Sequence, residues 1–73
     1  MTKQKMLCEM WEFLQRNNFS KNYWGEYETL AKQQFFNKGM KTNKKDLESL
    51  YNLFAYGYFY NDQPHLYYKL CNL

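Results

Sequence analysis

The residues best suited to metal binding or covalent catalysis in this sequence are its only histidine, His65, and its two cysteines, Cys8 and Cys71. Cysteine and histidine together bind Zn²⁺, but zinc sites draw their ligands from short, regular spacings. Cys8 and Cys71 lie at opposite ends of the chain, and the interval between His65 and Cys71 matches no zinc motif. We therefore predict neither a metal site nor a cofactor.

Covalent catalysis would need a nucleophile, a general base and a group that orients the base. Cys8 with His65 is the only candidate pair, and the apolar spacing around Cys8 instead predicts a buried thiol in the first helix. Paired carboxylates such as Glu9 and Glu12 have the spacing of a solvated helix face, and no glycine-rich loop exists to bind phosphate. The sequence therefore predicts that the protein is not an enzyme.

A lysine-rich segment, "KQQFFNKGMKTNKK" at residues 32–45, contains five lysines and no acidic residue. Four of them fall at the end of one predicted helix, in a turn and at the start of the next helix, and we call Lys38, Lys41, Lys44 and Lys45 the lysine cluster. Such a cluster suits the phosphate backbone of a nucleic acid or an acidic protein patch. No series of Arg, Gln or Asn at helical spacing follows to read bases, which disfavours sequence-specific DNA recognition. A solvated loop without a partner stays open.

Aromatic residues crowd the segment "YNLFAYGYFYNDQPHLYYKL" at residues 51–70, where eight of twenty residues are aromatic and six of these are tyrosine. Helical spacing assigns some of its apolar residues to the core, namely Tyr51, Phe54, Leu66, Tyr67 and Leu70. Short helices cannot bury every ring. We therefore predict a partner-binding aromatic cluster formed by Tyr56, Tyr58, Phe59, Tyr60 and Tyr68.

The residue types in this aromatic cluster favour a protein partner. Tyrosine combines an apolar ring with a polar edge and is enriched among the residues that dominate interface energies. Proteins that stack nucleobases interleave their aromatic residues with Lys or Arg, whereas residues 51–68 contain no basic residue apart from His65. The alternative is a core padded with tyrosine.

The elements that must position these groups are mostly helical. Apolar residues at spacings of three and four predict a helix over residues 3–16, capped by Thr2 and stopped by Asn17 and Asn18. A second helix should begin at an N-cap, Ser20, and extend to residue 38. Gly39 should end it in a Schellman motif that brings Met40 onto Phe35, with Gly25 as a weak point in the first turn.

The second half of the chain predicts one clear helix and one ambiguous segment. Thr42 or Asn43 should begin a helix with Asp46 in its first turn, and Gly57 should end it. After that, Asn61 or Asp62 can cap a last helix with Pro64 in its first turn and His65 exposed. Alternating tyrosines at 56, 58 and 60 leave an aromatic hairpin open. We predict an all-α bundle of three or four short helices, with an α+β fold carrying a C-terminal hairpin as the alternative.

The chain length and composition limit the number of domains and the cellular location. With 73 residues, the chain should form one domain, residues 1–73, because two would each be too small to form a core without disulfides or metals. Glu9 and Glu12 interrupt the stretch that a signal peptide keeps apolar, and no apolar run approaches the roughly twenty residues that span a bilayer. Two cysteines are too few for a secreted disulfide framework. We predict a cytoplasmic protein with reduced thiols and no membrane association.

The leading hypothesis is a small, non-enzymatic protein that binds and occludes a host protein, such as a defence or replication component. Abundant Lys, Asn and Tyr beside a single arginine, Arg16, suit AT-rich codons and favour an origin in a phage or mobile element. The aromatic cluster would supply the anchors, and the lysine cluster would steer the protein onto an acidic patch. Two alternatives stay open: binding of a nucleic-acid backbone through the lysine cluster, and a homodimer that buries its own aromatic residues.

Overall fold

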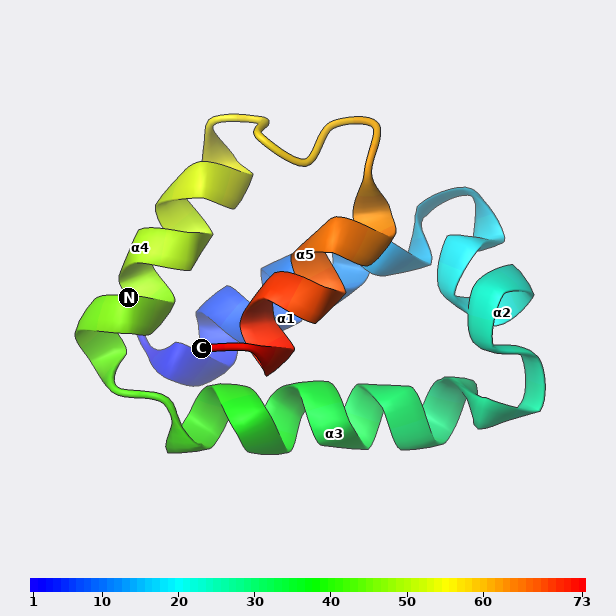
Figure 1. Cartoon of the computed structure of the whole chain (residues 1–73), viewed down its shortest axis with the longest axis horizontal. Coiled ribbons are helices and arrows are strands. Elements are labelled where there is room, and N and C mark those ends of the chain that lie inside the picture. Colours follow the sequence, from blue (N-terminus) through cyan, green and yellow to red (C-terminus); the bar gives the residue numbers. More distant parts are fainter.

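The chain folds entirely into helices and turns, as described by a computed structural model covering all residues 1–73 (Figure 1). The α-helices are α1 (Lys3–Gln15), α2 (Phe19–Trp24), α3 (Glu28–Lys41), α4 (Lys44–Ala55) and α5 (Gln63–Cys71), and two short 3₁₀-helices, Arg16–Asn18 and Gly25–Tyr27, flank α2. The predicted all-α class is confirmed. The tyrosine-rich C-terminal segment forms the predicted last helix, and the alternative aromatic hairpin is absent.

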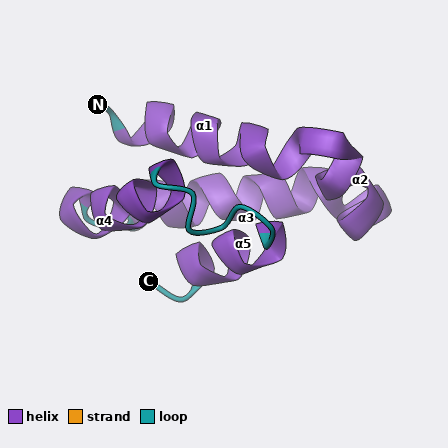
Figure 2. Ribbon diagram, turned by 90° about the horizontal axis from the view of Figure 1, so that it is seen from above, coloured by secondary structure: helices purple, strands orange, loops and turns teal.

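Helix α1 packs against all four other α-helices. In Figure 1 it runs behind α5, with α3 along one edge and α2 and α4 at the two ends, and Figure 2 shows α1 and α5 on opposite sides of the bundle. Six residues of α1 are buried: Met6, Leu7, Met10, Trp11, Phe13 and Leu14. The molecule measures 31 × 23 × 20 Å, so one layer of side chains fills the interior.

Both ends of α1 follow the sequence signals. The hydroxyl of Thr2 accepts a hydrogen bond from the backbone N–H of Lys5 at 3.1 Å, as expected of an N-cap. Asn17 and Asn18 both adopt the left-handed conformation, with φ of 57° and 58°, and so end the helix. Cys8 differs from the prediction: it is exposed, because its position falls between the apolar residues that face the core.

The predicted second helix is broken at Gly25. This glycine has φ 56° and ψ −126°, a conformation that side chains with a Cβ rarely adopt, and the chain turns there to begin α3 at Glu28. The prediction that Ser20 caps the helix is wrong. Ser20 lies inside α2, is buried, and donates its hydroxyl hydrogen bond to the carboxylate of Glu28 across the break. The bundle consequently has one more short helix than predicted.

The second correction concerns Gly39, which lies within α3 rather than beyond its end. Helix α3 continues to Lys41, and Met40 is exposed rather than packed on Phe35. A Cβ at Gly39 would lie 2.9 Å from Cγ of Leu7, so the missing side chain allows α1 and α3 to approach closely. Thr42 ends the helix and donates its hydroxyl to the carbonyl of Lys38 at 2.8 Å.

The remaining helix ends confirm the sequence signals. Asn43 caps α4 by accepting from the N–H of Asp46 at 2.8 Å, and Asp62 caps α5 by accepting from the N–H of His65 at 3.1 Å. Gly57 ends α4: its own N–H and that of Tyr58 donate to carbonyls of the last turn, both at 3.0 Å, in the pattern of a Schellman motif. These caps fix where the connecting segment from α4 to α5 begins and ends.

Replacing Gly39 with alanine should destabilise the fold, although such changes inside a helix ordinarily stabilise it. The added methyl group would press on Leu7, which is fully buried, and overpacking of this kind costs about 1–3 kcal/mol. Urea denaturation followed by circular dichroism measures the change. Asn37→Ala, at an exposed position of the same helix, is the control and should leave stability unchanged or slightly higher. A more stable Gly39→Ala variant would contradict the close approach of α1 and α3.

Candidate binding surface at the tyrosine loop and the α1–α4 cleft

Residues 56–62, which we call the tyrosine loop, connect α4 to α5 and display three tyrosines on an ordered backbone. Exposure reaches 92% for Tyr56, 58% for Tyr58 and 78% for Tyr60. Successive turns hold the loop, because the N–H of Tyr60 donates to the carbonyl of Gly57 at 3.1 Å and that of Asp62 donates to Phe59 at 2.9 Å. The tyrosine side chains are thus presented to solvent from a hydrogen-bonded segment.

Phe59 is a correction to the predicted aromatic cluster. Its exposure is only 1%, so it belongs to the core and does not present its ring to a partner. Its ring centroid lies 4.9 Å from that of Tyr58 and 5.4 Å from that of His65, both at steep angles. A loop that displays three large side chains needs an apolar anchor on its inner side, and Phe59 provides it.

Tyr68 is exposed, as predicted, but lies on a different part of the surface. It belongs to α5, and its hydroxyl shares a hydrogen bond of 3.1 Å with the hydroxyl of Tyr23 on α2. This hydrogen bond raises the pKa of Tyr23, with burial and the charge of a Tyr68 phenolate as smaller causes. Of the predicted cluster, only Tyr56, Tyr58 and Tyr60 form a single continuous segment.

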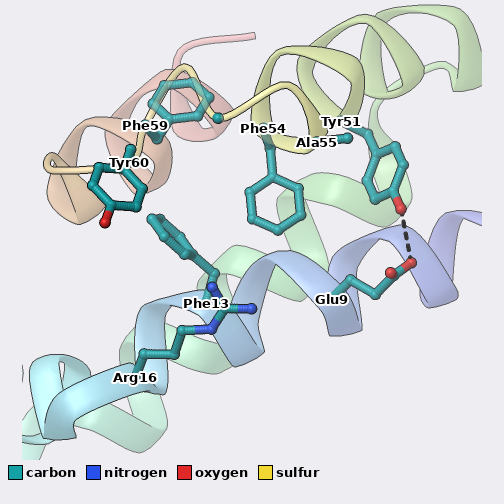
Figure 3. Close-up of a pocket in the computed structure, with 9 residues that line it drawn as sticks. Glu9, Phe13, Arg16, Tyr51, Phe54, Ala55, Phe59 and Tyr60 are labelled. Carbon is teal, nitrogen blue, oxygen red and sulfur yellow. Dashed lines mark hydrogen bonds between the residues drawn. The ribbon is translucent and has the colours of Figure 1, made fainter.

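A cleft of about 320 Å³ opens beside the tyrosine loop, between α1 and α4 (Figure 3). Its lining comes from α1, α4 and the loop, and consists of Glu9, Phe13, Arg16, Tyr51, Phe54, Ala55, Gly57, Phe59 and Tyr60. Phe13 of α1 and Phe54 of α4 meet edge to face, with ring centroids 5.4 Å apart. The α1–α4 cleft is therefore lined mainly by aromatic rings, which are partly exposed because α1 and α4 leave a gap between them.

The two ends of the α1–α4 cleft carry opposite charges. At one end, the hydroxyl of Tyr51 donates a hydrogen bond of 3.0 Å to a carboxylate oxygen of Glu9 (Figure 3). This hydrogen bond is the main cause that raises the pKa of Tyr51 above its ordinary value. At the other end, Cζ of Arg16 lies 5.5 Å from the centroid of the Phe13 ring, and its guanidinium pairs with no carboxylate.

Gln63, the first residue of α5, fixes the Arg16 end of the cleft. Its amide Nε2 donates to the carbonyl of Phe13 at 2.7 Å and lies 3.5 Å from the carbonyl of Arg16. Carbonyls at the end of a helix lack partners within the helix, so this side chain supplies the missing donor. The contact ties the end of the tyrosine loop to the end of α1.

The four residues of the lysine cluster lie on either side of the turn between two helices: Lys38 and Lys41 are in the last turn of α3, and Lys44 and Lys45 are in the first turn of α4. Part of its charge has an internal role: Nζ of Lys38 donates to the backbone oxygen of Leu73 at 2.7 Å. Lys3 joins the same end of the molecule by donating to the carbonyl of Met40 at 3.1 Å. These two lysines therefore satisfy backbone oxygens of the chain itself.

The sequence interpretation missed the α1–α4 cleft as a site. Phe54 and Tyr51 were expected in the core, yet they are only half buried and line the cleft together with Phe13. Arg16 carried one usable signal, since it is the only arginine among ten basic residues. Glu9 and Gln63 carried none, because a single carboxylate or amide in a helix has no distinctive spacing.

Of the groups considered for chemistry at the outset, Glu9 lines the α1–α4 cleft and His65 packs against Phe59 of the tyrosine loop, whereas Cys8 and Cys71 are not part of the cleft lining. No three His, Cys, Asp or Glu side chains stand close enough together to hold a metal ion. Nδ1 of His65 lies 3.8 Å from a carboxylate oxygen of Asp62 at the start of α5. None of the helices has the length and apolar character needed to cross a membrane. Comparisons with protein-family models, curated proteins and solved structures found no match.

Replacing Phe59 with alanine should destabilise the protein by about 3–5 kcal/mol, the usual cost of removing a buried phenylalanine ring. Tyr56→Ala is the matched control: its side chain belongs to the same loop but is 92% exposed, so stability should change by about 0.5 kcal/mol or less. Thermal denaturation followed by circular dichroism compares the two variants. Equal losses in both would contradict the division of the loop into one inward and three outward rings.

Replacing Glu9 with glutamine should lower the pKa of Tyr51 towards its ordinary value of 10.0. The carboxylate accepts a hydrogen bond from the neutral phenol and repels the phenolate, and the amide removes the second effect and weakens the first. An NMR titration of tyrosine labelled at Cζ measures this pKa. Glu12→Gln, an exposed position on the same helix, is the control, and equal titration in both variants would contradict the hydrogen bond.

Proposed function

We propose that this protein is a non-enzymatic binding module that recognises an acidic partner protein through the tyrosine loop and the α1–α4 cleft. One observation carries the proposal: Tyr56, Tyr58 and Tyr60, at every second position of the loop, are exposed, whereas Phe59 between the last two is buried. An anchored, hydrogen-bonded loop loses less conformational freedom on binding than a disordered one. Tyrosines held in this way resemble the residues that dominate protein interfaces.

The charge distribution supports an acidic partner. The formal net charge is +3, and no lysine or arginine forms an ion pair with a carboxylate within the chain. A partner surface that carries carboxylates would be attracted over some distance and would pair with Arg16 beside the tyrosine loop. The lysine cluster would contribute mainly to the rate of association.

Within this proposal, the protein acts in the cytoplasm as an inhibitor that covers a functional surface of a host protein. A chain of 73 residues that binds through one loop and one cleft acts most simply by blocking another molecule. The further hypothesis of a phage or mobile-element origin depends on amino-acid composition alone. It stays a prediction, together with the choice of a defence or replication component as the target.

The test combines capture with two sets of variants. Tagged protein is used to capture partners from host lysate, with and without nuclease treatment, and the binding of each captured protein is then measured with purified components. Replacing Tyr56, Tyr58 and Tyr60 with alanine should weaken binding of an acidic partner at least about tenfold, since truncating one such anchor costs about 2 kcal/mol. Tyr27→Ala, which removes a 62% exposed tyrosine elsewhere, is the control and should bind normally.

Three other results would contradict the proposal. Capture that disappears with nuclease, and with charge reversal at Lys41, Lys44 and Lys45, would assign the function to nucleic-acid backbone binding. A mass that doubles with concentration, and that the three tyrosine replacements abolish, would assign the tyrosine loop to a homodimer. Equal losses for the loop variant and Tyr27→Ala would place the interface elsewhere.

A further inference from the structure

We propose that the α1–α4 cleft is a subsite for one acidic segment of the partner: a large apolar side chain packs into the cleft against the paired rings of Phe13 and Phe54, and a neighbouring carboxylate pairs with Arg16. This inference rests on the proposed function and names the chemistry that the partner must present. It concerns the cleft alone, so it can fail while the tyrosine loop still binds. Four features of the cleft support it.

The first feature is the size and lining of the cleft. Its volume of about 320 Å³ is at the lower limit of ligand sites, which suits one large side chain better than a cofactor or drug-sized molecule. The rings of Phe13 and Phe54 lie at 65° to each other, and Tyr51 follows Phe54 with a centroid separation of 5.8 Å. An aromatic guest can therefore make both edge and face contacts.

The second feature is the unpaired guanidinium of Arg16. It lies against the ring of Phe13 and pairs with no carboxylate of the chain, so its N–H groups are free to form charge-assisted hydrogen bonds with a partner. Arginine presents two parallel N–H groups that match a carboxylate, which lysine does not. In a chain whose other basic residues are all lysine, the single arginine stands at the mouth of the aromatic cleft.

The third feature sets the direction in which a segment binds. Glu9 at the far end of the cleft would repel a carboxylate, and one of its oxygens already accepts from Tyr51. The carboxylate of the guest is therefore directed to the Arg16 end, and a donor group such as an amide N–H is favoured beside Glu9. A guest with the opposite order of groups would meet like charges at Glu9.

The fourth feature favours a polypeptide over a free acid. A second hollow continues beyond Arg16 and shares Phe13, Arg16 and Tyr60 with the cleft. Its remaining lining consists of the amide side chains of Asn17, Asn61 and Gln63. Amides supply both donors and acceptors, which match the peptide groups of a segment that runs on past the carboxylate.

A fragment titration tests the cleft without knowledge of the partner. The probes are 3-phenylpropionate and its uncharged analogue 3-phenylpropanamide, added to ¹⁵N-labelled protein and followed by two-dimensional NMR. The acid should bind with a Kd of roughly 1–10 mM, as its small size allows. Its largest shifts should fall on the amides of Phe13, Arg16, Phe54 and Tyr60, and the uncharged amide should bind about three- to tenfold more weakly.

Variants then assign the preference for the acid to one side chain. Arg16→Gln should abolish the difference between the two probes, whereas Lys21→Gln, an exposed change on α2 with the same loss of charge, should preserve it. Equal binding of acid and amide to the wild type, or shifts confined to other residues, would overturn the inference.

Partner binding separates this inference from the proposed function. If Arg16→Gln binds the partner normally and the three tyrosine replacements do not, the cleft inference is wrong and the proposed function stands. If Arg16→Gln weakens partner binding about tenfold or more and Lys21→Gln does not, the cleft is supported as the subsite for the acidic segment.

Discussion

The burial of one face of α1 is the constraint on which the rest of the structure depends. Every other α-helix contacts α1, and its buried residues meet rings from three of them. The indole of Trp11 lies 5.7 Å from that of Trp24 and 5.5 Å from the ring of Phe35, so one side chain joins α1 to α2 and α3. Its Nε1–H has no hydrogen-bond partner although it is buried, which indicates that aromatic packing outweighs the loss of that hydrogen bond.

The same helix connects the core to the candidate site. Glu9 and Phe13 lie on the side of α1 that faces α4, and Arg16 follows directly after the helix; these three residues form one wall of the α1–α4 cleft. The wall is rigid because Leu7 is pressed against Gly39 of α3 and because Gln63 holds the last turn from the other side. A rigid wall retains its binding geometry without a partner, which reduces the entropy lost on association. The contacts that form the core therefore also hold the wall of the α1–α4 cleft in place.

Signals between neighbouring residues predicted most of the helices. Features that depend on contacts between segments far apart in the sequence were not predicted. Caps act within three residues of themselves, so the sequence indicates Thr2 directly and narrows the caps at Asn43 and Asp62 to two neighbouring residues each. Gly39 reads as a helix end in the sequence, and only the neighbouring α1 reveals that it provides space. Phe59 alternates with tyrosines and looks equivalent to them, yet the side of the loop that it occupies depends on where α5 lies. The cleft depends in the same way on the distance between α1 and α4, and the residue spacing within either helix does not predict that distance.

The aromatic residues are sorted by chemistry, and this sorting bears on which surface binds. None of the phenylalanines is exposed, whereas six of the eight tyrosines are, so the hydroxyl group rather than the ring decides the side on which each lies. Of the other two, Tyr51 is half-buried and Tyr67 is buried, and burial raises the pKa of Tyr67 to about 12, which illustrates the cost of enclosing a phenolate. The exposure of an isolated tyrosine is therefore not evidence of an interface in this chain. The tyrosine loop differs from Tyr23, Tyr27 and Tyr68 because it adjoins an aromatic cleft with an unpaired arginine, and a partner can engage ring, hydroxyl and charge there at once.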